Sequence, residues 1–337
     1  MQAFEYASAS KKEQVAALLS DNGAILAGGT DLLALMKDDV VTPKRLVNIK
    51  QVDGLRGTSY QSGNGLRIGA LTTLAELAES NHDLAAYPML TEAANEAASA
   101  QIRNLATLGG NMCQRPRCWY FRNGMGLLAS EQSHDGVSFM VKGDNRYGAI
   151  LGNDGPAYFV SPSTIAPVLI AYGAKIRIYS AKASGTGVRE LPLEKFFLIP
   201  TTAGQREHDL KPDEMVIELI VPPPSKSLKA SSYEVRQRAA FDWPLAMASV
   251  ALEMDGDTVK SARVVLGHVA PIPWISNEAA DALVGKTVTP DTAMAAANAA
   301  VAKAKPLSRN KYKITLTKAA VKRAVQNAAA GSAGGVS

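Results

Sequence analysis

Two Gly-Gly pairs are the positions in this chain whose residue types and surroundings suggest binding chemistry. Gly28-Gly29 stands in AGGTDLL, between a run of strand character and a predicted helix, and Gly109-Gly110 stands in ATLGGN, at the end of a short apolar run. A Gly-Gly turn before a helix lets the backbone approach a ligand closely, and the N–H groups at the helix start attract anions. Such turns also serve tight packing alone, and that alternative stays open.

Each pair has a hydroxyl and an acid or amide beside it. Thr30 and Asp31 follow the first pair directly, and Thr107 and Asn111 flank the second. The Thr30 hydroxyl adds a donor beside the first turn, so this turn suits a phosphate group. Together the two turns could hold the two phosphates of a dinucleotide from opposite sides.

The common nucleotide-binding fingerprints and catalytic constellations are absent. Neither G-x-G-x-x-G nor G-x-x-x-x-G-K-[ST] occurs, which argues against a Rossmann dehydrogenase and a P-loop NTPase. The histidines are scattered and have no evident partner; they are His82, His134, His208 and His268. We therefore predict no catalytic side chain, and expect the chemistry to be that of a bound cofactor.

The two cysteines, Cys113 and Cys118, leave several interpretations open. A lone C-x4-C pair has too few ligands for a structural zinc or an iron–sulfur cluster. A redox pair or an intramolecular disulfide stays possible, because sequence spacing does not show whether the sulfurs meet. The residues alone favour two reduced thiols.

Composition describes a globular protein without a nucleic-acid or membrane signature. The chain has 337 residues, 47% of them hydrophobic and 20% charged, which is enough for two or three packed units. Its net charge of +5 is scattered rather than gathered on one stripe, so no nucleic-acid partner is expected. No apolar run is long enough to span a membrane, and the N-terminal segment does not resemble a secretory signal.

The predicted elements place the glycine pairs in the first two thirds of the chain. Residues 1–55 read as a β-α-β-α-β unit that contains Gly28-Gly29, and residues 56–224 as further strands and helices that contain Gly109-Gly110. Residues 119–158 read as a long irregular loop. Prolines 222–224 end this part, residues 225–328 read as an α+β unit with an antiparallel sheet, and residues 329–337 as a flexible tail.

The order of several motifs resembles a known family. ILAGGTDLLALMK, GALTTLAEL, IRNLATLGGNMCQ, SPS, YEVRQRAAFDWPLAMASVAL and GHVAPIPWISNEAADALVGK resemble the FAD-binding medium subunit of the xanthine dehydrogenase family of molybdenum hydroxylases. The stretch QRPRCWYFR is most similar to aldehyde oxidoreductase flavoprotein subunits. The resemblance implies an α+β fold: a two-part FAD-binding domain of the vanillyl-alcohol-oxidase type, followed by a C-terminal domain of the CO dehydrogenase flavoprotein type.

The resemblance also implies a function. Noncovalent FAD would receive electrons from a large molybdenum-cofactor subunit through the [2Fe-2S] clusters of a small subunit, and pass them to an external acceptor. It favours aldehydes as substrates of the assembly, with purines and other N-heterocycles open. The expected compartment is the cytoplasm, or the periplasm where a partner carries an export signal. The alternatives are a free-standing flavin oxidoreductase and a degenerate scaffold without FAD.

The resemblance assigns cofactor-binding residues by position. Residues 25–33 would wrap the FAD diphosphate, residues of the second turn would complete the site, and Val216 would lie near the flavin or ribose. The full set is Ile25, Leu26, Ala27, Gly28, Gly29, Thr30, Asp31, Leu32, Leu33, Thr107, Gly110, Asn111, Thr164, Val216 and Glu234. No metal ligand is assigned in this chain.

The chain departs from the family pattern at three places. Thr164 follows SPS where the family usually has Asp, and Glu234 stands where the family often has Lys. A Glu beside the flavin would lower the flavin potential, because it disfavours the negative charge of the reduced ring. Cys118 matches the first of four cysteines that hold a [4Fe-4S] cluster in similar subunits, whereas Ser138 and Tyr158 fall at or near other ligand positions. We expect no such cluster here.

Overall fold

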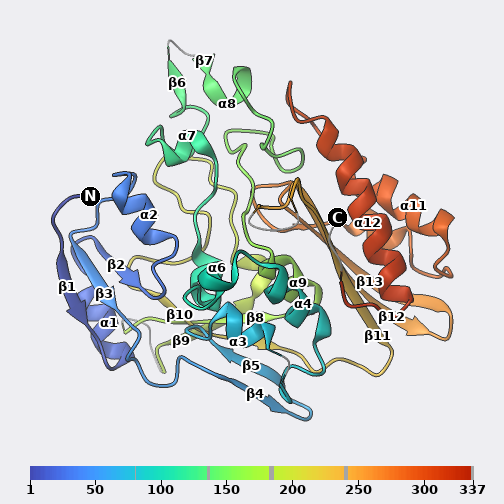
Figure 1. Cartoon of the computed structure of the whole chain (residues 1–337), viewed down its shortest axis with the longest axis horizontal. Coiled ribbons are helices and arrows are strands. Elements are labelled where there is room, and N and C mark those ends of the chain that lie inside the picture. Colours follow the sequence, from blue (N-terminus) through green and yellow to red (C-terminus); the bar gives the residue numbers. More distant parts are fainter. Residues whose placement is uncertain (80, 135–136, 182–185, 239–241, 335–337) are drawn as a thin grey trace.

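A three-stranded parallel sheet forms the N-terminal unit of the protein, seen at the left of Figure 1. The computed structural model describes residues 1–79, 81–134, 137–181, 186–238 and 242–334. The sheet has the order β1-β3-β2, with α1 and α2 as crossovers; the bounds are β1 (Glu5–Ser8), α1 (Lys12–Leu18), β2 (Gly23–Leu26), α2 (Leu32–Lys37) and β3 (Arg45–Asn48). The predicted β-α-β-α-β order is confirmed.

A five-stranded antiparallel sheet forms the central unit, in the order β4-β5-β10-β8-β9. Its strands are β4 (Thr58–Gln61), β5 (Gly65–Gly69), β8 (Lys175–Tyr179), β9 (Val188–Pro192) and β10 (Met215–Val221). The helical elements of this unit are α3 (Leu74–Ala78), α4 (Pro88–Glu96), α5 (Ala100–Arg103), α6 (Leu108–Cys113), α9 (Ile165–Ala171) and the 3-10 turn η1 (Leu193–Lys195). Every residue of α9 is buried, because α9 packs between this unit and the C-terminal sheet.

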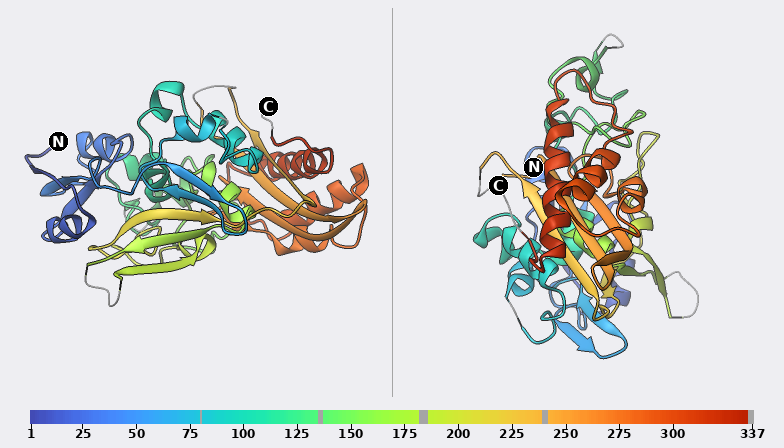
Figure 2. Two further views of the ribbon diagram at one scale, coloured as in Figure 1. Left: turned by 90° about the horizontal axis from the view of Figure 1, so that it is seen from below. Right: turned by 90° about the vertical axis from the view of Figure 1, so that its right-hand side faces the viewer.

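A four-stranded antiparallel sheet, β11-β12-β13-β14, forms the C-terminal unit. Its strands are β11 (Leu228–Val235), β12 (Ala246–Asp255), β13 (Thr258–Gly267) and β14 (Trp274–Ile275). Three helices pack against it: α10 (Asn277–Asp281), α11 (Pro290–Ala300) and α12 (Tyr312–Ala329). The left view of Figure 2 shows the N-terminal and C-terminal units at opposite ends of the molecule. Among the described residues, no helix is both long and apolar enough to cross a bilayer.

The C-terminal unit contains two features that the sequence did not predict. α12 was missed because its buried stripe consists largely of small residues, Ala320, Ala324 and Ala328 among them. The tail after α12 was expected to be flexible, yet the Ala333 carbonyl accepts a hydrogen bond of 3.1 Å from the Ser232 N–H on β11. Residues 335–337 of the predicted tail lie outside the described residues.

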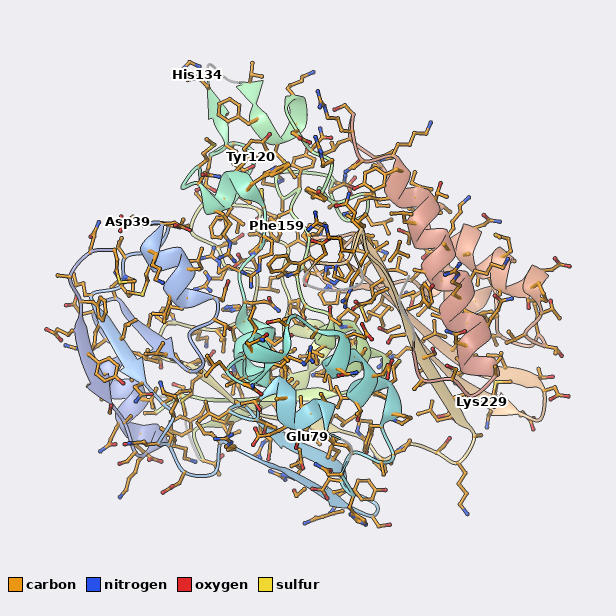
Figure 3. All side chains as sticks on the ribbon, in the orientation of Figure 1. Asp39, Glu79, Tyr120, His134, Phe159 and Lys229 are labelled. Atoms are coloured by element: carbon orange, nitrogen blue, oxygen red, sulfur yellow. The ribbon has the colours of Figure 1, made fainter. Side chains whose placement is uncertain are left out.

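Residues 119–158 form the projection at the top of Figure 1, and the prediction of one irregular loop is wrong for this segment. It contains α7 (Trp119–Arg122), β6 (Ser133–His134), β7 (Val137–Ser138) and α8 (Phe139–Lys142). Its base has a small apolar core that includes Phe121, Leu127 and Phe159, and Figure 3 shows Phe159 below Tyr120 along the projection. These apolar residues recur at neither the helical nor the strand period, so the sequence pattern did not predict that they form a core.

The projection is fastened to the C-terminal unit by a buried lysine. Lys313 on α12 is 1% exposed, and its ammonium group donates to the carbonyls of Tyr147, Gly148 and His268 at 3.2, 3.2 and 2.7 Å. Burial lowers the pKa of Lys313 to about 7. Three backbone acceptors on one cation hold the 147–148 backbone in place against α12 and β13.

Candidate functional site

The first glycine pair connects β2 to α2 and requires glycine at both positions. Gly29 has a φ of +72°, in the left-handed region that residues with a Cβ rarely adopt. Gly28 lies against the chain before α6, so closely that a Cβ on Gly28 would come within 1.8 Å of the Leu105 carbonyl oxygen. This approach brings the N-terminal unit to a point two residues before Thr107.

The backbone N–H groups of this turn are available to a ligand. Among the described residues, no hydrogen-bond acceptor serves the N–H groups of Gly28, Gly29, Thr30 or Asp31. Successive unpaired N–H groups at a turn that leads into a helix form a concave site of partial positive charge. This donor set fits the diphosphate of a dinucleotide.

The second glycine pair has a different structure, and the prediction that it forms a turn at the end of a short apolar run is wrong. Gly109 and Gly110 lie inside the first turn of α6, which follows another helix, α5. The Thr107 side chain caps α6 by accepting the Gly110 N–H at 3.2 Å, and Gly109 donates its N–H to the Ala70 carbonyl at 2.8 Å. The neighbouring N–H groups of Leu108 and Asn111 are also bonded within the protein. This segment offers side chains to a ligand, not backbone donors.

Asn111 starts a path of polar side chains toward the C-terminal sheet. The Ser163 hydroxyl donates to Asn111 Oδ1 at 2.6 Å, and Ser163 also caps the start of α9 through the Ala166 N–H. The next residue, Thr164, is buried and lies close enough to Glu234 on β11 to lower the pKa of that carboxyl. Two of the three departures from the family pattern, Thr164 and Glu234, are therefore neighbours.

Glu234 is a buried carboxylate with one unsatisfied oxygen. Arg236 donates from Nε and Nη2 to Glu234 Oε2, whereas Glu234 Oε1 has no hydrogen-bond partner among the described residues. Burial raises the pKa of Glu234, against the lowering by Arg236 and Thr164. Arg236 also donates to the Glu96 carbonyl at 2.7 Å, which joins this group to the end of α4.

Val216 and the ends of the 25–33 segment lie at the margins of this arrangement. Val216 pairs with Ile178 in the central sheet, and its side chain is buried in the main core. The carbonyl of the neighbouring Ile217 accepts the Ala70 N–H at 3.0 Å, and the Ala70 carbonyl accepts the Gly109 N–H of α6. Ala70 therefore connects the strand of Val216 to α6. Ile25, Ala27, Leu32 and Leu33 are half-buried around the first glycine turn, and Leu26 is buried at the end of β2.

Asp31 organises a group of arginines that the sequence analysis did not assign. Its carboxylate accepts the Arg115 backbone N–H at 2.8 Å and Arg122 Nη2 at 2.7 Å, and Arg117 Nη1 lies 2.8 Å from it. Burial lowers the pKa of Arg117 to about 10, and Arg117 Nε is buried without a partner among the described residues. The motif QRPRCWYFR was the sequence signal for these arginines. Their contact with Asp31 joins residues more than 80 positions apart, and sequence spacing does not reveal it.

A small hollow lies beside Asn111 and Ser163. Arg115 Nε donates to Glu207 at 2.6 Å on its wall, and His208 stacks on Phe196 with ring centroids 5.4 Å apart. Burial lowers the pKa of His208 to about 3, so this imidazole is neutral at physiological pH. Its ring nitrogens lie 3.3 Å from Arg206 Nη2 and 3.4 Å from the Leu210 backbone nitrogen, and its lowered pKa makes it a weak base.

The two cysteines are separate thiols. Burial raises the pKa of Cys113 to about 12 and also raises that of Cys118, whose Sγ lies 3.9 Å from Gln132 Nε2. Within the described part of the chain, no three His, Cys, Asp or Glu residues gather where they could hold a metal ion. Ser138, at one expected cluster position, caps α8 by accepting the Val141 N–H.

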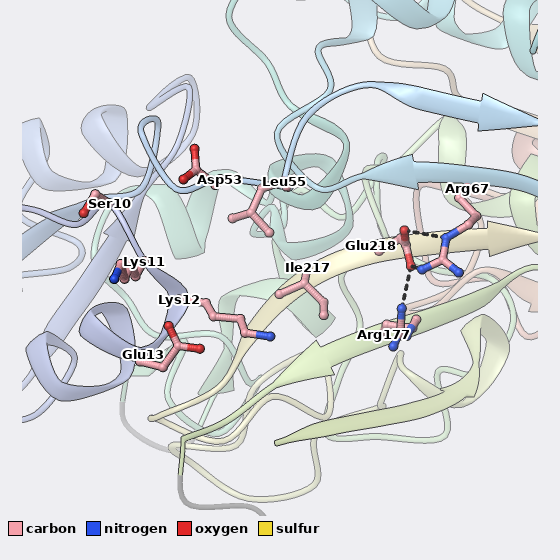
Figure 4. Close-up of a pocket in the computed structure, with 11 residues that line it drawn as sticks. Ser10, Lys11, Lys12, Glu13, Asp53, Leu55, Arg67, Arg177, Ile217 and Glu218 are labelled. Atoms are coloured by element: carbon pink, nitrogen blue, oxygen red, sulfur yellow. Dashed lines mark hydrogen bonds and ion pairs between the residues drawn. The ribbon is translucent and has the colours of Figure 1, made fainter. Parts of the chain in front are cut away.

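A larger open cleft lies elsewhere, between α1 and the central sheet, and Figure 4 shows its lining. Arg67 and Arg177 project into it, and both pair with Glu218, at 2.5 and 2.9 Å. Lys12 lies over the Tyr179 ring at 4.8 Å. The two arginines of this cleft share the Glu218 carboxylate, whereas the N–H groups at Gly28–Asp31 have no acceptor among the described residues.

Comparison with known proteins identifies the family. The FAD binding domain in molybdopterin dehydrogenase matches residues 2–224, about two thirds of the chain. This protein belongs to that family. The C-terminal domain of the CO dehydrogenase flavoprotein matches residues 231–328, so the predicted family and fold class are both confirmed.

Relatives in this family cover nearly the whole chain. The FAD-binding subunit of an aldehyde oxidoreductase from Escherichia coli is 32% identical over 295 residues, 87% of each chain. The medium chain of carbon monoxide dehydrogenase from Hydrogenophaga pseudoflava is 28% identical over 332 residues, 96% of each chain. A solved structure of carbon monoxide dehydrogenase from the same organism superposes with a TM-score of 0.76 at 27% identity, covering 98% of this chain and 99% of that one.

Proposed function

We propose that this protein is the FAD-carrying electron-transfer subunit of a multi-subunit molybdenum hydroxylase that oxidises aldehydes. The observation that carries the proposal is the unpaired donor set at Gly28, Gly29 and Thr30, pressed against the segment that leads to α6. Because the chain belongs to the FAD-binding family, the diphosphate of FAD is the ligand that we assign to these donors.

The residues of this chain would bind and orient the cofactor. The N–H groups of Gly28, Gly29 and Thr30 would neutralise the diphosphate, with Asp31 holding the neighbouring arginines in place. Thr107, Gly110 and Asn111 would line the opposite side of the diphosphate site. Thr107 and Asn111 would contribute side chains and Gly110 its exposed backbone, because the N–H groups of Gly110 and Asn111 are already bonded within the protein. The remainder of the predicted set, Ile25, Leu26, Ala27, Leu32, Leu33 and Val216, would shape the surrounding walls.

Thr164 and Glu234 would lie at the flavin end of the site. Asn111, Ser163 and Thr164 lead step by step from α6 to Glu234, which supports placing the flavin ring near the C-terminal sheet. Bound FAD would supply the redox chemistry of this subunit, because no side chain in the described part of the chain is arranged as a nucleophile or general base. The protein contributes position, exclusion of water and local charge.

Partners complete the proposed assembly. A large subunit with the molybdenum cofactor would oxidise the aldehyde, and a small subunit with [2Fe-2S] clusters would relay the electrons to this chain. Aldehydes are preferred because the E. coli relative is named an aldehyde oxidoreductase subunit. The proposed compartment is the cytoplasm, or the periplasm if a partner carries an export signal.

Purification of the assembly tests this proposal. The complex should contain one large and one small partner chain and show a flavin absorption band that an aldehyde bleaches anaerobically. This chain alone should bind FAD and leave aldehydes unchanged. A complex without flavin contradicts the proposal, and aldehyde oxidation by the isolated chain favours a free-standing oxidoreductase instead.

The charge at Glu234 predicts a shift in the flavin potential. Glu234→Gln keeps the shape of the side chain and removes its negative charge, so the flavin midpoint potential should rise. A redox titration of the FAD-loaded protein measures the potential, and Glu218→Gln, in the distant cleft, serves as the control. An unchanged midpoint in Glu234→Gln would rule out a role for this carboxyl in setting the potential.

A further inference from the structure

The open cleft between α1 and the central sheet has no role in the function proposed above. Its volume is about 340 Å³, near the lower end of the range of about 300–1,000 Å³ that is typical of small-molecule sites. Its described lining contains none of the residues assigned to FAD. A ligand of this cleft would therefore be a second ligand of the chain.

A β-bulge in β10 directs two neighbouring side chains into this cleft. In the pairing of β10 with β8, Val216 lies opposite Ile178 and Glu218 lies opposite Arg177, so Ile217 is an extra residue of β10. Consecutive side chains of a regular strand point to opposite faces, and a bulge redirects them; such bulges are common next to active sites. Here Ile217 and Glu218 both line the cleft, so the bulge places an apolar and an acidic side chain in one site.

The two arginines at one end of the cleft spend only part of their donors on Glu218. Arg67 donates from Nε and Nη2 at 2.9 and 2.5 Å, and Arg177 donates from Nη1 at 2.9 Å. Among the described residues, Arg67 Nη1 and Arg177 Nη2 have no hydrogen-bond partner. Both side chains are partly exposed, at 41% and 28%, so each guanidinium group can donate to a further anion.

Lys12 enters the cleft from α1, and apolar side chains lie beside it. Its ammonium group lies 4.8 Å from the centroid of the Tyr179 ring, and no carboxylate of the described residues forms an ion pair with it. Figure 4 shows Lys12 extending toward Ile217, with the arginine pair beyond. Leu55 and Ile217 belong to the core between the N-terminal unit and the central sheet. The cleft thus combines cationic groups with an apolar floor.

The charges of the lining match a ligand with a single negative charge. The cationic side chains exceed the anionic ones by one; they are Lys11, Lys12, Arg67 and Arg177, against Glu13, Asp53 and Glu218. A monoanion neutralises this excess, whereas a dianion leaves uncompensated negative charge beside three carboxylates. A carboxylate fits the forked donors of arginine, and an apolar body attached to it gains by covering the floor.

We propose that this cleft binds a small organic monocarboxylate. The carboxylate group would lie against Arg67 and Arg177, and Lys12 would add a third cation. The apolar body of the ligand would cover Leu55 and Ile217. Because Lys12 belongs to the N-terminal unit and the arginines to the central sheet, the ligand would bridge the two units and stabilise the folded chain. The site requires no FAD and does not depend on the proposed function.

Calorimetric titration of the full-length chain with benzoate tests the proposal, because benzoate carries one carboxylate on a flat apolar ring. Benzoate should bind at one site per chain and raise the melting temperature. Arg177→Met and Lys12→Met should each weaken binding about tenfold, through loss of a charge-assisted contact. Arg263→Met is the matched control and should keep the affinity: Arg263 is also a partly exposed strand arginine that pairs with a glutamate, Glu194 at 3.3 Å, and it lies outside the cleft.

Two further ligands separate the parts of the proposed chemistry. Benzyl alcohol has the ring without the charge, and inorganic phosphate has the charge without the ring, so each should bind at least about tenfold more weakly than benzoate. Benzyl alcohol that binds as tightly as benzoate overturns the anion site. Phosphate that binds more tightly than benzoate overturns the monocarboxylate assignment. Absence of saturable benzoate binding, or wild-type affinity in Arg177→Met, overturns the proposal as a whole.

Amide signals of the 15N-labelled wild-type chain test the same proposal without a substitution. Benzoate should move the N–H signals of Leu55 and Ile217, which line the cleft. It should leave those of Gly28, Gly29 and Thr30 in place. Shifts at the glycine turn alone would overturn the proposal, because they would assign benzoate to the proposed diphosphate site. FAD binding by a chain that ignores benzoate would leave the proposed function intact.

Discussion

The two Gly-Gly pairs share a dipeptide and differ in backbone conformation and in the hydrogen bonding of their N–H groups. Gly28-Gly29 lies in an open turn, in which Gly29 has a positive φ and Gly28 lies against the Leu105 carbonyl. The N–H groups of this pair have no acceptor among the described residues. Gly109-Gly110 lies in the first turn of a helix, with both N–H groups bonded inside the protein. We propose that the first pair serves a ligand, whereas Gly109 of the second pair packs closely against Ala70.

The difference shows what glycine supplies at each place. At the first pair, glycine gives backbone freedom and exposes donors, so any Cβ disturbs the proposed diphosphate site directly. At the second pair, Gly109 gives close approach to Ala70, where a Cβ would come within 2.9 Å of the alanine methyl. Substitution by alanine at the four positions should therefore separate ligand binding from stability.

Gly28→Ala should have the largest effect. Its Cβ meets the Leu105 carbonyl oxygen, a backbone atom that moves only with its segment. We expect a loss of about 3 kcal/mol in the free energy of unfolding from overpacking. FAD affinity should fall about a hundredfold, because the donors shift by a large part of an ångström. Chemical denaturation and FAD titration measure the two effects, and wild-type affinity would show that the turn does not hold the cofactor.

Gly29→Ala should have the second largest effect. A Cβ at a φ of +72° costs about 1–2 kcal/mol, and its nearest neighbour is the flexible Leu33 side chain. FAD affinity should fall about tenfold, since each 1.4 kcal/mol is a factor of ten. Gly54→Ala, at a φ of +74° with open space around it, is the matched control and should lose stability while keeping FAD affinity.

Gly109→Ala should reduce stability and spare the cofactor. The new methyl crowds Ala70, although alanine favours the helix by about 1 kcal/mol over glycine. The net loss should be about 1 kcal/mol, since overpacking a tight contact costs about 1–3 kcal/mol. FAD affinity should stay close to the wild-type value in the same titration. A strong loss of FAD with little loss of stability would reverse the proposed roles of the two pairs.

Gly110→Ala should have the smallest effect. This glycine is exposed, it is helical, and its Cβ would come within 3.0 Å of the Thr107 hydroxyl oxygen alone. The helical preference of alanine and this contact nearly cancel, so the change in stability should stay within about 0.5 kcal/mol. A change much larger than this in thermal unfolding would mean that the Thr107 cap is less tolerant than its geometry indicates.

The sequence predicted local order better than contacts between distant segments. The β-α-β-α-β unit around Gly28 was predictable because apolar periods and turn residues alternate there. The helical setting of Gly109 was not predictable, since the short run LATL before the Gly pair fits a strand end and a helix start equally well. α12 was not predicted because a stripe of small residues gives only a weak apolar periodicity.

The candidate site was predictable as a set of positions and not as an arrangement. The family resemblance named Asp31, Asn111 and Glu234, but it did not show that Asp31 holds Arg117 and Arg122 or that Ser163 joins Asn111 to Thr164. Contacts of this kind come from tertiary packing, which local patterns do not encode.

Backbone amide chemical shifts during FAD titration of the 15N-labelled chain test the central claim most directly. The N–H signals of Gly28, Gly29 and Thr30 should move strongly, because these unpaired donors acquire phosphate acceptors. The signal of the buried Gly109, already bonded to the Ala70 carbonyl, should move much less. A large shift at Gly109 with none at Gly28–Thr30 would contradict the account.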